Sequence, residues 1–260
     1  MGNIEITKRE ILVAIIIFCI MMGVGFFIYD KVVDAIAADK EVYETALKIK
    51  NKDDFDYSIE TQQGNIIVEA DFKARDTVTF PELKNSYMYI AKKKEEYTMH
   101  TRTYTDDKGN MHTETYWTWD YAGKETKQSK LVKLFERTFP AEQFNLIHAE
   151  SLDIQQALKK GYKSKGWNVN YYYTSDDIRY YYEVVPIKFQ ATFLAKAGEK
   201  GLQPSAGGKI GLYEGSMESF IKGVETGFIA TKFIFWAIWI VVTLLLMYAY
   251  VSRENEYLED

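Results

Sequence analysis

Two uninterrupted apolar segments lie near the two ends of this chain and enclose about two hundred residues of mixed polar composition. They cover residues 11–29 and 233–251, and neither contains a charged side chain. At about 1.5 Å per residue, each segment would form a helix roughly 28 Å long, close to the thickness of the hydrocarbon core of a bilayer. The sequence therefore predicts two transmembrane helices, with the lipid bilayer as a partner.

The segments next to these apolar runs extend the prediction to the whole architecture. Residues 30–51 contain neither Pro nor Gly and place apolar side chains along one helical stripe. Ser216 is suited to cap a helix that continues into the second apolar run. We expect helical stalks at residues 30–51 and 216–232 around one β-rich soluble domain at residues 52–215, which makes the fold class an α+β membrane protein.

Basic residues beside the apolar runs predict the orientation of the chain. Lys8 and Arg9 precede the first run and Arg253 follows the second, while three lysines flank the opposite side. The positive-inside rule gives most weight to short loops, and the first helix usually dominates. We therefore expect a multi-pass protein of the cell membrane, with the tails at residues 1–10 and 252–260 in the cytoplasm and the central domain outside.

Charge and cysteine content narrow the classes of partner and cofactor. The net charge is −5, and basic residues alternate with acidic ones, which argues against a nucleic-acid partner. The single cysteine, Cys19, lies in the first apolar run, so no intramolecular disulfide and no cysteine-based zinc site is expected. We expect no cofactor.

In the central domain, alternation of apolar and polar residues between frequent turn residues predicts β-structure. Strands are expected at residues 58–61, 65–73, 77–80, 188–196 and 209–213. One short helix is expected at residues 151–160, where Gly161 would end it.

The clearest element is a long hairpin that joins residues 87–104 to residues 111–121 through a turn with Gly109 in a left-handed conformation. If Asp106 faces Asn110, the register places Arg102 opposite Glu114. The same register would place Glu96 opposite Asp120, so we expect the pairing to end or bulge there.

This register also sorts the hairpin side chains onto two faces. One face would carry an apolar and aromatic set that we expect to be buried, namely Tyr97, Met99, Trp117, Trp119 and Tyr121.

Two runs of three tyrosines surround residues 174–177, and a second hairpin would lay them across from each other. A helix beginning at Ser175 is the competing prediction, because Ser-Asp-Asp is also a capping sequence. We favour the hairpin, and its tyrosines form the candidate interaction surface: Tyr171, Tyr172, Tyr173, Tyr180, Tyr181 and Tyr182.

Residues able to carry catalysis or bind a metal are dispersed. His100 and His112 share one face of the long hairpin, but Tyr104 would face His112, so the two rings lie about 13 Å apart. That separation is too large for one metal ion. The acidic pairs lie at turns or helix ends, where Asp bonds backbone amides. No nucleophile-elbow, phosphate-loop or zinc-protease motif is present. We expect no metal site and no enzymatic activity.

Four short segments support a resemblance to a known family, and they lie at residues 78–81 (Val-Thr-Phe-Pro), 87–90 (Tyr-Met-Tyr-Ile), 96–98 (Glu-Tyr-Thr) and 117–119 (Trp-Thr-Trp). Together with the two apolar runs, they resemble the beside-a-membrane (GIDE-like) domain of two-pass mitochondrial ubiquitin ligases and their bacterial relatives. The resemblance covers residues 64–121. The RING domain of that family is absent after the second apolar run, so the resemblance implies no ligase activity.

These observations lead to two main functional hypotheses, beside a third, a membrane-embedded hydrolase with an unfamiliar site, which predicts clustered His and carboxylate groups in a cleft. The first is a non-enzymatic membrane protein whose extracytoplasmic domain binds a protein partner or forms a homo-oligomer. The alternative is a sensor or receptor that binds a glycan, lipid or other envelope ligand through exposed aromatic side chains.

Overall fold

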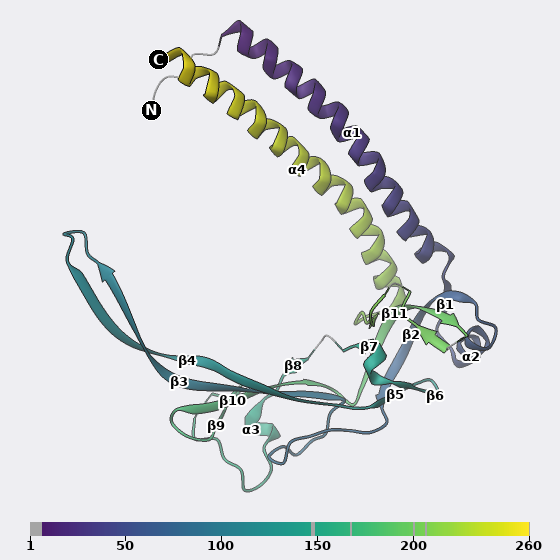
Figure 1. Ribbon diagram of the computed structural model, residues 1–260. Helices are drawn as coiled ribbons and strands as arrows, with labels where there is room; N and C mark the ends of the chain where they lie inside the picture. The colour runs from purple at the N-terminus through teal and green to yellow at the C-terminus, as the bar shows by residue number, and fades with distance from the viewer. Residues whose placement is uncertain (1–6, 147–148, 167, 200, 206, 260) are drawn as a thin grey trace. The chain divides into compact units, whose positions relative to one another are not determined.

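The computed structural model describes residues 7–146, 149–166, 168–199, 201–205 and 207–259. The chain divides into two compact units, one formed by Met1–Ala46 with Met217–Asp260 and the other by Leu47–Ser216. Two long apolar terminal helices thus flank a β-rich domain, as predicted (Figure 1). Residues 1–6 of the predicted N-terminal tail lie outside the described residues.

The first helix, α1 (Lys8–Thr45), begins with a capping box. The Thr7 hydroxyl accepts from the Glu10 amide at 3.3 Å, and the Glu10 carboxylate accepts from the Thr7 amide at 2.6 Å. These two bonds satisfy amides that have no partner within the helix.

The helix ends at Thr45, so the predicted stalk through residue 51 was wrong for its last turn and a half. The backbone becomes extended at Ala46, and Leu47–Ile49 forms β1, which pairs in parallel with β2 (Gly64–Ala74). Ile49 is fully buried in the core of the central domain. A continued helix would forgo both the strand pairing and this burial, so tertiary packing overrides the helical pattern.

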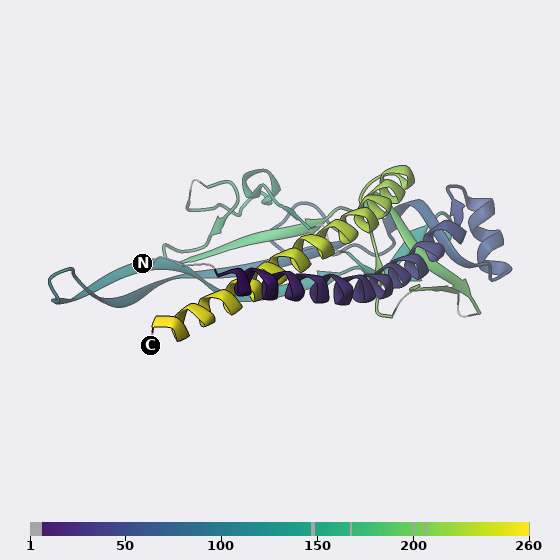
Figure 2. The same cartoon turned by 90° about the horizontal axis from the view of Figure 1, so that it is seen from above.

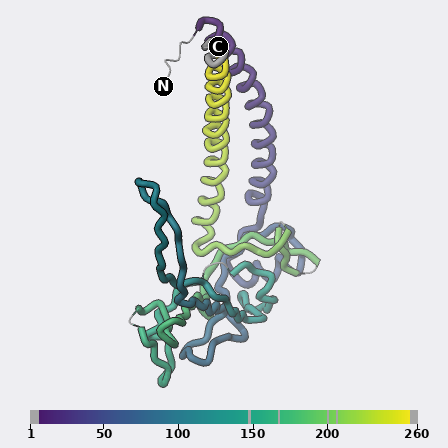
Figure 3. Tube along the Cα trace, turned by 60° about the vertical axis from the view of Figure 1, so that its left-hand side comes forward, coloured from purple at the N-terminus to yellow at the C-terminus, as the bar shows by residue number. Residues whose placement is uncertain are grey.

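The second terminal helix, α4 (Met217–Glu259), packs along α1 (Figures 1 and 3). The Trp239 indole donates to the Met21 carbonyl at 2.9 Å, and its ring fills the space that a Cβ at Gly25 would need. Only 11% of the most apolar stretch of α1 and 6% of that of α4 is buried by the described protein. Both helices are long and apolar enough to cross a membrane.

The first sheet has six strands among the described residues, in the order β12-β11-β2-β5-β6 with β1 beside β2. Its further strands are β11 (Lys188–Gly198), β12 (Gly201–Gln203), β5 (Leu131–Leu134) and β6 (Arg137–Pro140). The predicted strands at 65–73 and 188–196 are confirmed as β2 and β11. One face of this sheet carries the main core, in which the Phe72 ring contacts those of Phe144 and Phe193.

A helix, α2 (Lys52–Glu60), replaces the strand predicted at residues 58–61. The Asn51 side chain accepts from the Asp54 amide at 2.9 Å, and Asp53 and Asp54 lie in the positively polarised first turn. The helix places Phe55 in the core of the first sheet. Capping and this one buried ring outweigh the strand propensity of the segment.

The second sheet has the order β4-β3-β10-β8, with β9 beside β10, among the described residues. Its strands are β3 (Tyr89–Thr105), β4 (Met111–Gln128), β8 (Glu150–Ser151), β9 (Tyr172–Tyr173) and β10 (Ile178–Val185). Both predicted hairpins are confirmed, because β3 pairs with β4 and β9 with β10. A second, smaller core beneath this sheet contains Leu83, Ile90, Ile154 and Tyr182.

The predicted register of the long hairpin is also confirmed. Arg102 faces Glu114, Gly109 has φ +83°, and the Asp106 amide donates to the Asn110 carbonyl at 2.9 Å. Glu96 does face Asp120, and a bulge follows between Lys94 and Glu95.

The expected burial of the hairpin's aromatic set was wrong. Trp117 is 52% exposed, Met99 58% and Tyr121 63%. For Met99 and Trp117 the reason is that β10 begins at Ile178 opposite Glu96, so beyond this point β3 pairs with β4 alone and the two strands project as a ribbon (Figure 2). Tyr121 lies opposite Glu95 on the edge strand β4. Alternation along a strand predicts two faces but not whether another element covers one of them.

The remaining elements are short. The helix predicted at residues 151–160 is a single turn, α3 (Ile154–Ala157), because residues 150–151 pair with β10 and Asp153 caps the turn. The strand predicted at 77–80 is one bridge between Val78 and Tyr87, and that at 209–213 shortens to β13 (Ile210–Gly211). A 3₁₀ turn, η1 (Ala141–Gln143), leads into β7 (Phe144–Asn145), which pairs in parallel with β13.

The difference between the core and the projecting ribbon predicts different costs of truncation. Phe72→Ala should lower the free energy of unfolding by about 3–5 kcal/mol, because it removes a ring packed on three others. Trp117→Ala should change it by only about 0.5 kcal/mol. Denaturant unfolding of the full chain in detergent, followed by near-ultraviolet circular dichroism, measures both. Equal destabilisation by the two variants would contradict a ribbon outside the core.

Candidate functional site

One face of the second sheet carries a set of aromatic rings together with one methionine and one arginine, and we call it the aromatic face. Its side chains come from β3, β4, β10 and the segment through β9. They are Tyr97, Met99, Trp117, Trp119, Tyr121, Tyr171, Tyr173, Arg179 and Tyr181.

In the ribbon, the Tyr97 ring lies against two indoles. Its centroid is 5.1 Å from Trp119, the residue directly opposite, and 5.4 Å from Trp117, with an interplanar angle of 24°. Offset stacking of this kind stabilises a pair beyond the area it buries. These contacts restrict the orientation of the rings, although Tyr97 and Trp117 are exposed.

Arg179 joins the ribbon to the tyrosine hairpin. Its guanidinium carbon lies 4.3 Å from the Trp119 ring centroid and 3.8 Å from that of Tyr171. Its Nε donates to Glu95 at 2.6 Å, and both side chains are largely buried, at 14% and 16% exposed. A cation held between two rings and neutralised by a carboxylate is a rigid arrangement, because each partner restricts the others.

The six candidate tyrosines divide between the two faces of the sheet. Tyr171, Tyr173 and Tyr181 belong to the aromatic face, whereas Tyr172 and Tyr180 pack against the smaller core. Tyr182 is fully buried in that core, so the prediction that it lies on a surface was wrong. Successive side chains of a strand point to opposite faces of the sheet, so neighbouring tyrosines of one run lie on different faces.

Sequence reasoning missed Arg179. The available signal was its place two residues before Tyr181 on the same strand face, together with the acidic Glu95 on β3. Only the pairing of β10 with β3, which sets Arg179 directly opposite Glu95, brings the two together.

On the other face of the sheet, an ion pair between the buried Glu82 and the partly buried Lys92 connects three segments. The Lys92 ammonium donates to Glu82 at 2.6 Å, and the Tyr182 hydroxyl donates to the same carboxylate oxygen at 2.5 Å. The ammonium also lies 4.4 Å from the Tyr180 ring centroid and 5.4 Å from that of Phe80.

Opposing effects act on the acid groups of this cluster. Burial pushes the pKa of Glu82 upward, but hydrogen bonds from Lys92 and Tyr182 outweigh it, so the pKa lies below its ordinary value. Burial, with a further contribution from the Glu82 carboxylate, raises the pKa of Tyr182. The Glu82 carboxylate is thus ionised at neutral pH, and its bonds to Lys92 and Tyr182 hold the Glu82 loop to β3 and β10.

The two histidines of the ribbon pair with different carboxylates. His100 Nε2 lies 2.5 Å from Asp120, and His112 Nε2 lies 2.9 Å from Asp106. Hydrogen bonds from Thr98 and His100 hold the pKa of Asp120 at about 2. Within the part of the chain that the structure describes, no group of three or more His, Cys, Asp or Glu side chains could hold a metal ion.

Comparison with family models, curated proteins and solved structures found no match for this chain. The resemblance to the GIDE-like domain therefore stays a prediction.

The Glu82–Lys92 pair predicts a pH-dependent stability. Since the pKa of Glu82 is lower in the folded chain than in the unfolded one, its contribution is present above the unfolded value and is lost as pH falls through the folded value. Glu82→Gln should lower the free energy of unfolding at pH 7 by about 3 kcal/mol, because it leaves a largely buried ammonium without its counter-charge.

Chemical denaturation from pH 3 to pH 8 measures this effect, and the gap between wild type and Glu82→Gln should shrink toward the acidic end. Glu142→Gln is the matched control, since Glu142 is exposed and its substitution should have no such effect. A gap that stayed constant with pH would contradict the assignment.

Proposed function

We propose that this chain is a non-enzymatic two-pass integral membrane protein. The β-rich domain uses its aromatic face to bind a protein partner or a second copy of the chain. The observation that carries the second part is the set of ring contacts among Tyr97, Trp117 and Trp119, in which Tyr97 and Trp117 are exposed.

Membrane insertion is supported by the outward-facing surfaces of α1 and α4. Large apolar side chains such as Leu12, Phe27, Phe233 and Leu245 are more than half exposed on these helices. The helices cover little of each other's apolar stretch. Such a surface is stable in hydrocarbon and costs free energy in water.

The composition of the aromatic face supports a protein partner. Trp, Tyr, Met and Arg are the residue types enriched at protein interfaces, and Trp, Tyr and Arg dominate binding hot spots. Stacking and the Arg179–Glu95 pair already restrict the side chains, so binding would lose little further side-chain entropy. Met99 and Tyr121 extend the exposed area on either side of the rings.

Association should depend on the aromatic face and not on the opposite face of the same ribbon. We expect Trp117→Ala to weaken association at least about tenfold, as expected for a hot-spot side chain. Tyr116→Ala is the matched control, because Tyr116 is an exposed aromatic residue on the polar face. Light scattering after size exclusion in mild detergent, with crosslinking in intact membranes, reports the mass relative to the 30.2 kDa chain.

A wild-type monomer without a co-purifying protein would contradict the proposal. If the monomer were instead stabilised against heat by envelope glycans or lipids, and Trp117→Ala removed that stabilisation, the ligand-binding alternative would replace it.

Orientation is tested by labelling cysteines in a Cys19→Ser background. Asn110→Cys, at the exposed tip of the ribbon, should react with a membrane-impermeant maleimide from outside intact cells. Ser252→Cys, beyond the second apolar run, should react only after lysis. The reverse labelling pattern would place the central domain in the cytoplasm.

A further inference from the structure

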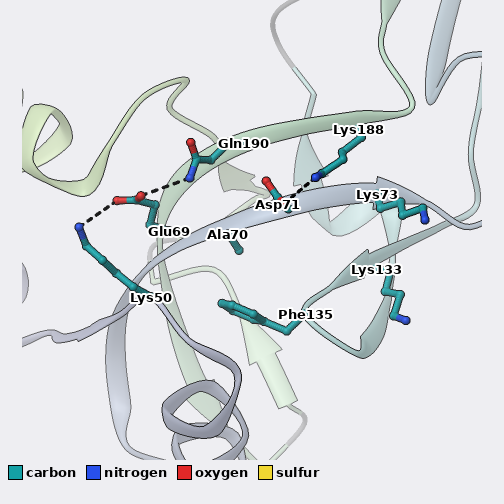
Figure 4. A pocket seen from close by; sticks show the side chains of 9 residues that line it. All are labelled: Lys50, Glu69, Ala70, Asp71, Lys73, Lys133, Phe135, Lys188 and Gln190. Atoms are coloured by element: carbon teal, nitrogen blue, oxygen red, sulfur yellow. Dashed lines mark hydrogen bonds and ion pairs between the residues drawn. The ribbon is translucent and has the colours of Figure 1, made fainter.

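A second candidate site lies on the first sheet, away from the aromatic face. A cleft of about 450 Å³ lies at this sheet, lined by charged side chains and by Ala70 and Phe135, which belong to or pack against the main core (Figure 4). Four lysines and two carboxylates line it: Lys50, Lys73, Lys133, Lys188, Glu69 and Asp71. The lysines leave two positive charges in excess, in a chain whose net charge is −5.

Three of these lysines form a row across neighbouring strands. Lys73 on β2 lies directly opposite Lys188 on β11 and directly opposite Lys133 on β5. Directly opposite residues share a face of the sheet, with Cβ atoms roughly 5 Å apart, and like charges in these positions destabilise the pairing. The lysine row is therefore an arrangement that the fold alone does not favour.

The carboxylates of the cleft neutralise only part of this charge. Lys188 lies 2.9 Å from Asp71, and Lys50 lies 3.3 Å from Glu69. The ammonium groups of Lys73 and Lys133 have no hydrogen-bond or ion-pair partner among the described residues, and Figure 4 shows both side chains at the end of the cleft away from Glu69. The two unpartnered lysines are thus exposed neighbours on adjacent strands.

We propose that this cleft binds a phosphate group, with Lys73 and Lys133 contacting its oxygens. Lysine binds phosphate as a flexible point charge, and two ammonium groups on adjacent strands can reach oxygens of the same group. The bound anion offsets the repulsion along the lysine row. A soluble phosphoester and a phospholipid headgroup share this chemistry.

The test uses the full chain in nanodiscs of phosphatidylcholine, with inorganic phosphate as the probe. Phosphate should raise the melting temperature saturably, relative to sodium chloride of equal ionic strength. Lys73→Met and Lys133→Met should each weaken the apparent phosphate affinity about tenfold, the effect of losing one charged hydrogen bond. Each variant should also melt at a higher temperature than wild type without phosphate, because the substitution relieves the repulsion.

Lys196→Met is the control, since Lys196 is an exposed lysine on the same β11 strand outside the lysine row. It should leave the phosphate response unchanged. The proposal is overturned if phosphate has no effect beyond ionic strength, or if all three variants respond alike.

Nanodiscs that contain phosphatidylglycerol distinguish the two sources of the phosphate. If the headgroup occupies the cleft, added phosphate no longer raises the melting temperature of the wild-type protein in these discs. The same protein in phosphatidylcholine discs still responds to phosphate. A response that persists in both discs assigns the cleft to a soluble phosphoester. None of these outcomes depends on the aromatic face, so the phosphate site and the proposed association stand or fall separately.

Discussion

The pairing register of β3 is the constraint on which both faces of the second sheet depend. The inner half of this strand lies between β4 and β10, where Ile90 and Ala91 are fully buried and Lys92 pairs with the buried Glu82. The outer half pairs with β4 alone, so the direction in which its side chains point is set by the inner half of the same strand. A slip by one residue would put Lys92 on the opposite side of the sheet and turn Tyr97 away from Trp119. The Glu82–Lys92 ion pair and the aromatic rings on the opposite face are therefore two results of one register.

The two candidate surfaces differ in whether their cationic side chains are neutralised by carboxylates. On the aromatic face, Arg179 is neutralised by Glu95, and the neighbouring Lys93 is neutralised by Glu183. This leaves a surface of rings with little net charge, which suits an apolar partner. On the first sheet, Lys73 and Lys133 stay without counter-charges among the described residues. The same domain thus has one surface whose desolvation is favourable and another on which binding of an anion is favourable.

The sequence determined the elements whose signals are local. Turn chemistry at Asp106 and Gly109, with Arg102 opposite Glu114, was enough to predict the register of this strand pair from the turn as far as the bulge between Lys94 and Glu95. Elements that depend on contacts between residues distant in the sequence could not be predicted. The strand expected at residues 58–61 is a helix because Phe55 reaches the core, and α1 stops at Thr45 because β2 is available to pair with β1. Arg179 and Glu95 lie 84 positions apart, so only the fold brings them together.

The long ribbon also leaves an open backbone edge. β4 is the outermost strand of its sheet among the described residues, so one side of its peptide groups has no strand partner. Its inner half carries Lys124, Glu125 and Lys127 next to a bulge, and charges and bulges are the means by which natural sheets block the addition of foreign strands. The outer half, residues 111–119, has Glu114 as its single acidic residue and no lysine, arginine or proline. Protection against strand addition is thus unevenly distributed along one strand, and the unprotected part is the part that reaches furthest from the core. An extended segment of another chain that approached this edge would find free peptide groups at the same place where the aromatic rings are exposed.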